Sequence, residues 1–286
     1  MAIYDRIEVL KGASGLLSGA GSLGGTINLV RKKPTSDFHG HITIGAGSWD
    51  SYRTEVDVSG PLTESGNVRG RAVAAYQDRQ SYIDRYSNQT SVFYGILEVD
   101  LTPDTLLTVG ADYQDNKPQG STWSGSFPLY NYAGEINSAK RSFSNATDWS
   151  SWQQYTRTVF ATLEQDLGSS PFDLFARAGW SSAESGNICG AEAQASAGVI
   201  FKKPLEVMTG LKEADGNFFG VGFSVSKPDA DTLAETRPGH DREMILECTY
   251  SFSITPYCLI QPSYQYVKNP SGRDDVNPAN IFSVQC

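Results

Sequence analysis

The sequence predicts an all-β fold, namely an antiparallel transmembrane β-barrel of about twelve strands. Charged residues make up only 19% of the 286 residues and aromatic residues 11%, with 28 glycines and 14 tyrosines, a composition of strand formers and turns. Apolar and polar residues alternate through most of the chain, and no apolar run approaches the ~18 residues that a membrane helix needs. A transmembrane β-barrel leaves this weak hydropathy signal because only alternate residues face lipid.

Twelve strand-like alternations follow residue 37, an even number, as single-chain bacterial barrels have. They begin near residues 38, 51, 67, 90, 105, 156, 172, 193, 217, 243, 258 and 280. In the second strand, apolar and charged residues alternate as Tyr52, Thr54, Val56 and Val58 against Arg53, Glu55 and Asp57. A face with this charge does not suit the core side of a soluble sheet, so we expect it to line a polar lumen. We also expect the barrel to close, because closure satisfies edge hydrogen bonds that lipid cannot satisfy.

The segment after residue 243 gives the clearest alternation in the chain. We expect Met244, Leu246, Tyr250 and Phe252 to point outward, and Glu247, Thr249 and Ser251 to point inward. This assignment fixes which side of the wall meets lipid.

Short and long connections alternate along the chain, which is typical of a transmembrane barrel with tight turns on one rim and loops on the other. The connections at Gly60–Asn67 and Thr102–Asp104 are short, whereas the one from Asn116 to Gln154 is long. This long loop carries aromatic residues among Gly, Ser and Asn, namely Trp123, Phe127, Tyr130, Tyr132, Trp149 and Trp152. These rings either pack the loop onto itself or form a stacking surface for a bulky ligand.

The stretch from Tyr4 to Pro34, YDRIEVLKGASGLLSGAGSLGGTINLVRKKP, places two short half-buried strand patterns around a glycine-rich turn. Such a turn suits a loop tip that approaches a ligand or partner closely. A phosphate-binding loop is disfavoured, because GxxxxGK[ST] is missing and the element that follows is a strand rather than a helix.

Composition and motifs also exclude several functions. The net charge of −9 argues against nucleic acid as a partner, since no basic stripe is present. No CxxC spacing is found among Cys189, Cys248, Cys258 and Cys286, so we expect no zinc or redox site. His39 and His41 share a strand face and are interpreted as solvated polar positions rather than metal ligands, without a third ligand in view. No GxSxG motif is present, so we expect neither an enzyme nor a cofactor.

The motifs of the first part resemble TonB-dependent outer-membrane ferric siderophore receptors. RIEVLKG and GGTINLVRK are similar to strands at the end of the plug domain of that family, and the resemblance continues over about residues 4–168 through GSWDSYR, VSGPLTESGNVRGRAVAAYQD, SYIDRY and STW. The last part, about residues 172–286, instead resembles carbohydrate-selective porins of the OprB type through DREMILECTYSFSITPYCLIQPSYQYVKNPSGRDDV and IFSVQC. The resemblance implies a plug remnant at residues 1–35 and a barrel at 36–286, receptor-like over 36–168 and porin-like over 172–286.

The receptor resemblance implies a bacterial outer-membrane protein, embedded in lipid, that binds a ferric siderophore of the hydroxamate type. It places the ligand between the plug apex, Gly15, Leu16, Leu17 and Ser18, and the loop aromatics Trp123, Phe127, Tyr130 and Tyr132. The alternatives are a passive carbohydrate-selective porin that passes sugars and an engineered or non-functional barrel. The sequence shows neither a secretory signal nor an energy-coupling box, so we expect a mature fragment or truncated gene without TonB contact.

The plug-like segment is too short to bury a core of its own, so we expect it to lie inside or against the barrel wall. Its charged residues Arg6, Glu8, Lys11 and Arg31 are then expected to pair with lumen charges such as Arg53, Glu55, Asp57, Glu98 or Asp100.

Overall fold

The computed structural model describes residues 2–11, 25–121, 130–138, 140–168, 170–184, 191–214, 216–228, 242–255 and 258–285. In these residues the fold consists of a twelve-stranded antiparallel sheet and a separate two-stranded hairpin. The hairpin is formed by β1 (Tyr4–Lys11) and β2 (Gly25–Arg31). The one α-helix in this part of the chain, α1 (Pro204–Thr209), has six residues, and no described helix could cross a membrane.

All twelve predicted strands are present, and each pairs with its neighbours in sequence. They are β3 (His39–Gly47), β4 (Ser51–Pro61), β5 (Val68–Gln80), β6 (Ser87–Thr102), β7 (Thr105–Gln119), β8 (Gln154–Asp166), β9 (Phe172–Glu184), β10 (Ala191–Lys202), β11 (Phe218–Pro228), β12 (Glu243–Thr255), β13 (Cys258–Lys268) and β14 (Ala279–Gln285). The antiparallel β-barrel class is therefore confirmed.

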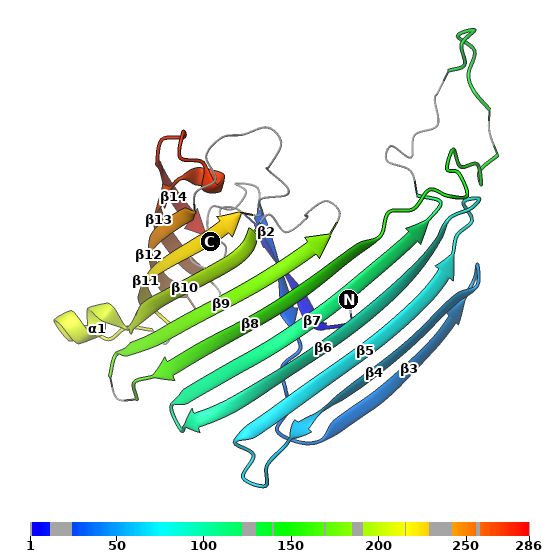
Figure 1. Ribbon diagram of the computed structural model, residues 1–286. Helices are drawn as coiled ribbons and strands as arrows, with labels where there is room; N and C mark the ends of the chain where they lie inside the picture. The colour runs from blue at the N-terminus through cyan, green and yellow to red at the C-terminus, as the bar shows by residue number, and fades with distance from the viewer. Residues whose placement is uncertain are drawn as a thin grey trace.

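The sheet does not close within the described residues, in contrast to the prediction. Figure 1 shows a strongly curved wall whose ends, β3 and β14, stand apart. Within the described residues, β3 pairs with β4 and β14 pairs with β13, and neither has a second neighbour. The described residues thus form a curved wall of twelve sequentially paired strands. Local alternation specifies the strands and their neighbours, and it does not specify whether the first and last strands meet.

The two faces of the wall have the predicted polarity. In β12, Glu247, Thr249 and Ser251 are buried at 4%, 1% and 1% exposure, whereas Leu246 is 44% exposed. In β4, Glu55 and Asp57 are likewise buried, while Val56 and Val58 are exposed. The polar face is therefore the inner face and the apolar face is the outer one, which confirms the predicted register.

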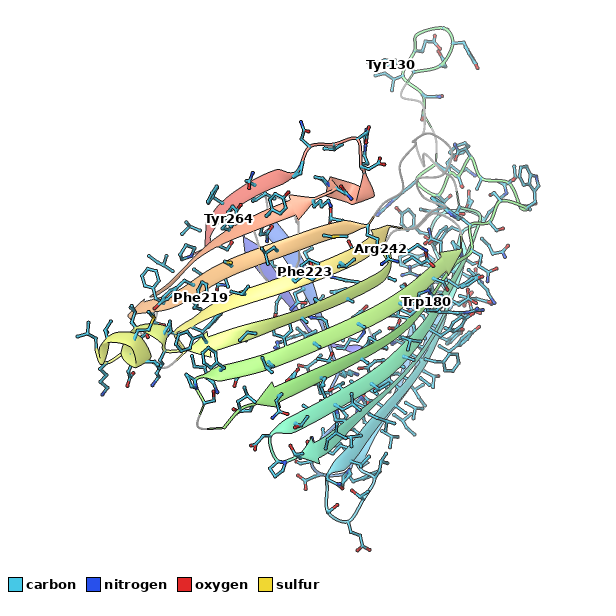
Figure 2. The ribbon with its side chains drawn as sticks, turned by 60° about the vertical axis from the view of Figure 1, so that its left-hand side comes forward. Tyr130, Trp180, Phe219, Phe223, Arg242 and Tyr264 are labelled. Atoms are coloured by element: carbon cyan, nitrogen blue, oxygen red, sulfur yellow. The ribbon has the colours of Figure 1, made fainter. Side chains whose placement is uncertain are left out.

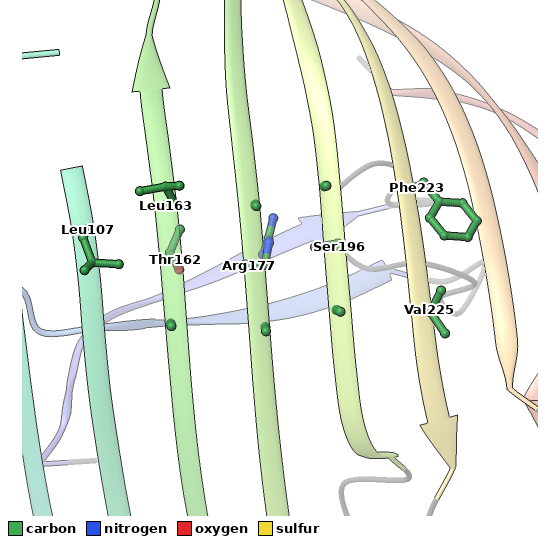
Figure 3. A pocket seen from close by; sticks show the side chains of 12 residues that line it. Leu107, Thr162, Leu163, Arg177, Ser196, Phe223 and Val225 are labelled. Atoms are coloured by element: carbon green, nitrogen blue, oxygen red, sulfur yellow. The ribbon is translucent and has the colours of Figure 1, made fainter. Parts of the chain in front are cut away.

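The outer face is hollowed by a shallow groove across β8, β9 and β10 (Figure 3). Small side chains form its floor, namely Ala161, Ala176, Ala178, Ala195 and Ala197. Leu107 and Leu163 border it on one side, and Phe223 and Val225 on the other. The hairpin lies behind the strands in this view, so the groove opens away from the lumen.

The two rims differ as the connection lengths predicted. One rim carries the short connections after β4, β6, β8 and β12, and also α1 after β10. The other rim carries the longest described connection, between β7 and β8, together with the segments that follow β5 and β13. We call these the turn rim and the loop rim.

Candidate functional site

The hairpin β1–β2 is attached to the inner face by the residues at its base. Ile3, directly before β1, is 1% exposed and belongs to the apolar core, which lies between this base and the wall. The wall contributes side chains from β5 and β6 to this cluster, namely Val73, Ala75, Val92, Tyr94 and Ile96. An apolar patch on an otherwise polar inner wall therefore marks where the hairpin docks.

Lys32, directly after β2, is the centre of the polar attachment. Its Nζ lies 2.8 Å from Oδ2 of Asp57 and 3.4 Å from Oε1 of Glu55. Arg71 donates to both oxygens of Asp57, each at 2.8 Å, so this carboxylate joins two cations from two parts of the chain. The hydroxyl of Tyr94 donates to the carbonyl oxygen of Lys32 at 2.8 Å. We call Lys32, Asp57, Arg71 and Tyr94 the anchor cluster.

Arg31 makes a second attachment one residue earlier. Its Nη2 lies 3.2 Å from Oδ2 of Asp112, and its guanidinium stacks over the ring of Phe160 at 4.7 Å. Gly110 leaves the room for this ring, because a Cβ there would lie 2.4 Å from Cζ of Phe160. The wall thus provides an anion, an aromatic face and space for them.

The expectation that the plug-like segment leans on the wall is confirmed, but its charges pair only in part as predicted. Arg31 does reach a wall carboxylate. Arg6 instead pairs with Asp5 and Glu8 of its own strand, at 3.3 and 2.7 Å, and Glu8 accepts a hydrogen bond from Asn28 at 2.9 Å. The predicted pairing of Arg6 and Glu8 with wall charges is therefore wrong, because the middle of the hairpin stands away from the wall. The side chain of Lys11 lies outside the described residues.

The same distance from the wall corrects the prediction of half-buried hairpin strands. Both strands form, yet their apolar residues Ile7, Val9, Ile27 and Leu29 are 46%, 64%, 67% and 41% exposed. Only the base is packed, so the hairpin projects into the lumen. Figure 1 shows its turn end directed toward the loop rim.

Two of the predicted wall partners are occupied within the wall itself. Arg69 lies 2.6 Å from Asp100 and 3.7 Å from Glu98. These carboxylates therefore have a neighbouring cation on β5 and do not reach the hairpin.

Three inner residues, His41, Glu55 and Asp57, hold their potential ligand atoms within 4.8 Å of one another. This grouping was not foreseen, since the sequence reasoning paired His41 with His39. Lys32 already pairs with both carboxylates and Arg71 with one of them. The group is therefore best described as an ion-pair network with a histidine at its edge.

The long β7–β8 connection is held to the neighbouring loop by its returning arm, residues 140–153. The N–H of Asp84 donates to the carbonyl oxygen of Ser142 at 2.7 Å, and Arg85 lies 2.9 Å from Asp148. The N–H of Gly120 donates to the carbonyl oxygen of Ser150, also at 2.7 Å. The base of the loop is thus fixed on the loop rim.

The tip of this loop, residues 130–136, is a small hairpin that displays two of the predicted aromatic residues. Oδ1 of Asn131 accepts from the N–H groups of Ala133 and Glu135, at 2.9 and 3.0 Å, and Tyr130 bridges to Ile136. Tyr130 is 57% exposed and Tyr132 is fully exposed. Figure 2 shows Tyr130 far above the wall. We call residues 130–136 the aromatic tip.

The structure does not bring the predicted site residues together within the part that it describes. Trp123 and Phe127 in the loop, and Gly15, Leu16, Leu17 and Ser18 at the plug apex, lie outside the described residues. Trp149, also on the loop, is 83% exposed, so it does not pack the loop onto itself. Of the anchor cluster, the sequence predicted Asp57 as a wall partner of the hairpin but missed Lys32, Arg71 and Tyr94. The signal for Lys32 was the basic run Arg31–Lys33 next to a strand end.

Comparison with curated proteins relates the chain to pyoverdine receptors. It is 71% identical over 169 residues to the ferripyoverdine receptor of Pseudomonas aeruginosa, covering 59% of this chain and 21% of that receptor. It is 38% identical over 296 residues to the ferric-pyoverdine BN7/BN8 receptor of Pseudomonas putida, covering 99% of this chain and 33% of that receptor. The chain thus spans between a fifth and a third of the length of these relatives.

Among solved structures, the pyoverdine outer-membrane receptor FpvA of Pseudomonas aeruginosa PAO1 bound to pyoverdine is similar over 99% of this chain. The TM-score is 0.74 at 40% identity, and 48% of that receptor chain is covered. This similarity and the one to the Pseudomonas putida receptor both extend past residue 170, into the part that resembles porins in sequence. The model of the carbohydrate-selective porin, OprB family, matches residues 31–286, and the chain belongs to that family.

Proposed function

We propose that this chain, a bacterial outer-membrane protein, forms the ligand-facing part of a ferric siderophore receptor. The observation that carries the proposal is the attachment of the β1–β2 hairpin to the inner wall through the anchor cluster and Arg31. A passive channel does not need an ion-paired segment inside its lumen, whereas a receptor that presents a loop to its ligand does. The identity of 71% to a ferripyoverdine receptor supports the same function.

The ligand class that we propose is a ferric hydroxamate-type siderophore such as ferric pyoverdine. Such a chelate is bulky, with apolar faces and a ring of oxygens, so aromatic planes and exposed backbone N–H groups complement it. We propose that Gly15, Leu16, Leu17 and Ser18 contact it from the hairpin side. Trp123, Phe127, Tyr130 and Tyr132 would contact it from the loop.

We also propose that the chain is divided into a plug remnant at residues 1–35 and a barrel wall at residues 36–286. The wall is continuous across the proposed border between 168 and 172, because β8 and β9 pair from Tyr155↔Glu184 to Asp166↔Asp173. A ligand seated on the receptor-like part would therefore rest on one continuous sheet.

Tryptophan fluorescence tests the proposal. The detergent-solubilised protein is titrated with ferric pyoverdine and, separately, with a ferric trihydroxamate, and quenching is followed in the unmodified chain and in Trp123→Ala. Removal of one stacked aromatic ring at about 1.4 kcal/mol should weaken binding roughly tenfold. Trp49→Ala is the matched control, because Trp49 lies on a different turn of the loop rim and is 58% exposed. Absence of saturable quenching with both chelates would refute the proposal.

A passive sugar channel is the second candidate, favoured by the match to the carbohydrate-selective porin family. Its test is the swelling of liposomes that contain the protein in a neutral sugar. Swelling without siderophore binding would transfer the assignment to a porin, and binding without swelling would support the receptor.

A further inference from the structure

The outer face of the wall carries a girdle of aromatic side chains close to the loop rim. Tyr76 near the end of β5 and Trp180 near the end of β9 are both exposed on this face. Phe93, Tyr113 and Tyr155 lie between them on β6, β7 and β8, with ring centroids 6.4 and 6.5 Å apart along the row. Such girdles mark the level of the lipid headgroups in outer-membrane barrels, and the rim with long loops is the extracellular one.

A cation lies within this girdle. Arg157 of β8 is exposed and shares the outer face with Val159, because it is separated by an odd number of positions from Phe160, whose ring lies on the lumen side. Its guanidinium carbon lies 5.0 Å from the ring centroid of Tyr155 and 5.8 Å from that of Tyr113. The two tyrosine rings therefore hold this positive charge at the level of the headgroups.

Within the described part of the chain, no carboxylate forms an ion pair with Arg157. Asp115, which lies opposite Tyr155 in the sheet, instead pairs with Lys117 at 3.1 Å and accepts a hydrogen bond from Gln153 at 3.0 Å. A cation that faces the membrane surface without a protein anion is complemented by the anionic groups of lipid headgroups.

An apolar hollow of about 550 Å³ begins at Arg157, a volume within the ~300–1,000 Å³ of small-ligand sites. A second hollow shares its floor and continues it toward the turn rim, past Leu97 and Val109. We call the two together the outer furrow. Each strand from β4 to β8 has a neighbour on both sides, so the outer furrow belongs to the middle of the sheet. Small residues form its floor and larger apolar residues its sides, namely Ala72, Ala74, Gly95 and Ala111, and Val56, Val58, Phe93 and Val159.

We propose that this surface binds lipid A, the phosphorylated glycolipid of the extracellular leaflet, with a phosphate on Arg157 and an acyl chain in the outer furrow. A guanidinium matches the geometry of a phosphate with two parallel hydrogen bonds. The outer furrow runs from this cation toward the turn rim, which is the direction of an acyl chain that descends from its headgroup into the bilayer. The groove across β8, β9 and β10 lacks this combination, because Lys227, the outward cation near its loop-rim end, pairs with Glu192.

Lipid titration followed by native mass spectrometry tests the proposal. The delipidated protein in detergent is titrated with lipid A, and the lipid molecules bound to each chain are counted. Arg157→Gln should weaken binding about tenfold, since it removes a hydrogen bond to a charged group. Arg177→Gln is the matched control and should leave the affinity unchanged. Arg177 also lies near an aromatic ring, 5.9 Å from that of Phe175, but it pairs in register with Thr162 on the inner face.

Gly95→Leu tests the outer furrow without changing any charge. A Cβ at Gly95 would meet nothing within 4 Å, so the larger side chain fills the outer furrow without a clash in the sheet. We expect it to weaken lipid A binding, and we expect no change for Ala197→Leu, which fills the groove across β8, β9 and β10 instead. Unchanged affinity in Arg157→Gln or Gly95→Leu, or an equal loss in the controls, would overturn the proposal. Equal affinity for dephosphorylated lipid A or for phosphatidylethanolamine would also overturn it.

Discussion

The anchor cluster predicts that Asp57→Asn releases the hairpin from the wall. Asp57 is 2% exposed and is the carboxylate that joins Lys32 of the hairpin base to Arg71 of the wall. The amide has nearly the same shape as the carboxylate but carries no charge. The substitution therefore removes the anion and leaves two cations facing each other.

The magnitude follows from the contacts that remain. Breaking a buried ion pair by removing one partner costs roughly 3–5 kcal/mol. Lys32 keeps Glu55 at 3.4 Å and its side chain is 14% exposed, so we take a value just below this range, about 2.8 kcal/mol. A loss of this size raises the fraction of detached hairpin by about 100-fold.

Limited trypsin digestion measures that fraction, because Arg31 and Lys32 are themselves cleavage sites at the hairpin base. When detachment is rapid and reversible, the cleavage rate follows the population of the detached state. Cleavage after these residues should be about 100-fold faster in Asp57→Asn than in the unmodified chain.

Asp50→Asn is the matched control, since it makes the same chemical change at an exposed turn with φ of 48°, a conformation that asparagine tolerates. We expect no change in the cleavage rate for this variant. An unchanged rate in Asp57→Asn, or an equal increase in both variants, would refute the anchoring role.

Three further predictions concern the apolar base and two connections. Ile3→Ala should weaken hairpin attachment by about 3 kcal/mol because Ile3 is 1% exposed, whereas Ile7→Ala, at 46% exposure, should leave tryptic cleavage unchanged. Gly120→Ala should lower the free energy of unfolding by about 2 kcal/mol more than Gly134→Ala, as measured by thermal unfolding. Both glycines have positive φ, but a Cβ at Gly120 would lie 2.2 Å from the carbonyl oxygen of Arg85, whereas a Cβ at Gly134 would meet nothing within 4 Å. Equal losses in the two variants would contradict this. Burial opposes ionisation of Glu213, but hydrogen bonds from Tyr250, Asn217 and two backbone N–H groups outweigh it and lower its pKa. The ionised Glu213 therefore stabilises α1 fully above the unfolded pKa near 4.5, and this stabilisation is lost as the pH falls through the lower folded pKa. Hydrogen exchange at the Leu205 N–H, which donates to Glu213, should become faster over that fall in pH. Glu213→Gln should abolish this pH dependence.

The strands and their faces were determined by the sequence alone. Alternation of period two is a local property, and a strand places successive side chains on opposite faces whatever its neighbours are. For this reason the twelve strand positions, the buried Glu247 and the exposed Leu246 could all be read from the chain. The rims followed as well, because the length of a connection limits the distance that it can span.

The attachment of the hairpin was decided by tertiary structure. The sequence placed the hairpin against the wall, but Lys32 meets Asp57 across 25 positions and Arg31 meets Asp112 across 81. Which charges meet depends on where the chain leaves the hairpin and on the cations, such as Arg69, that already neutralise other wall carboxylates.

The curvature of the wall likewise depends on the whole sheet rather than on any strand. Each strand pairs with its neighbour in sequence, whereas the separation of β3 and β14 depends on curvature and twist accumulated over all twelve strands. A repeat of period two carries no information about that sum. The sequence therefore determined what each strand presents to lumen and lipid, and the tertiary structure decided how strongly the wall curves.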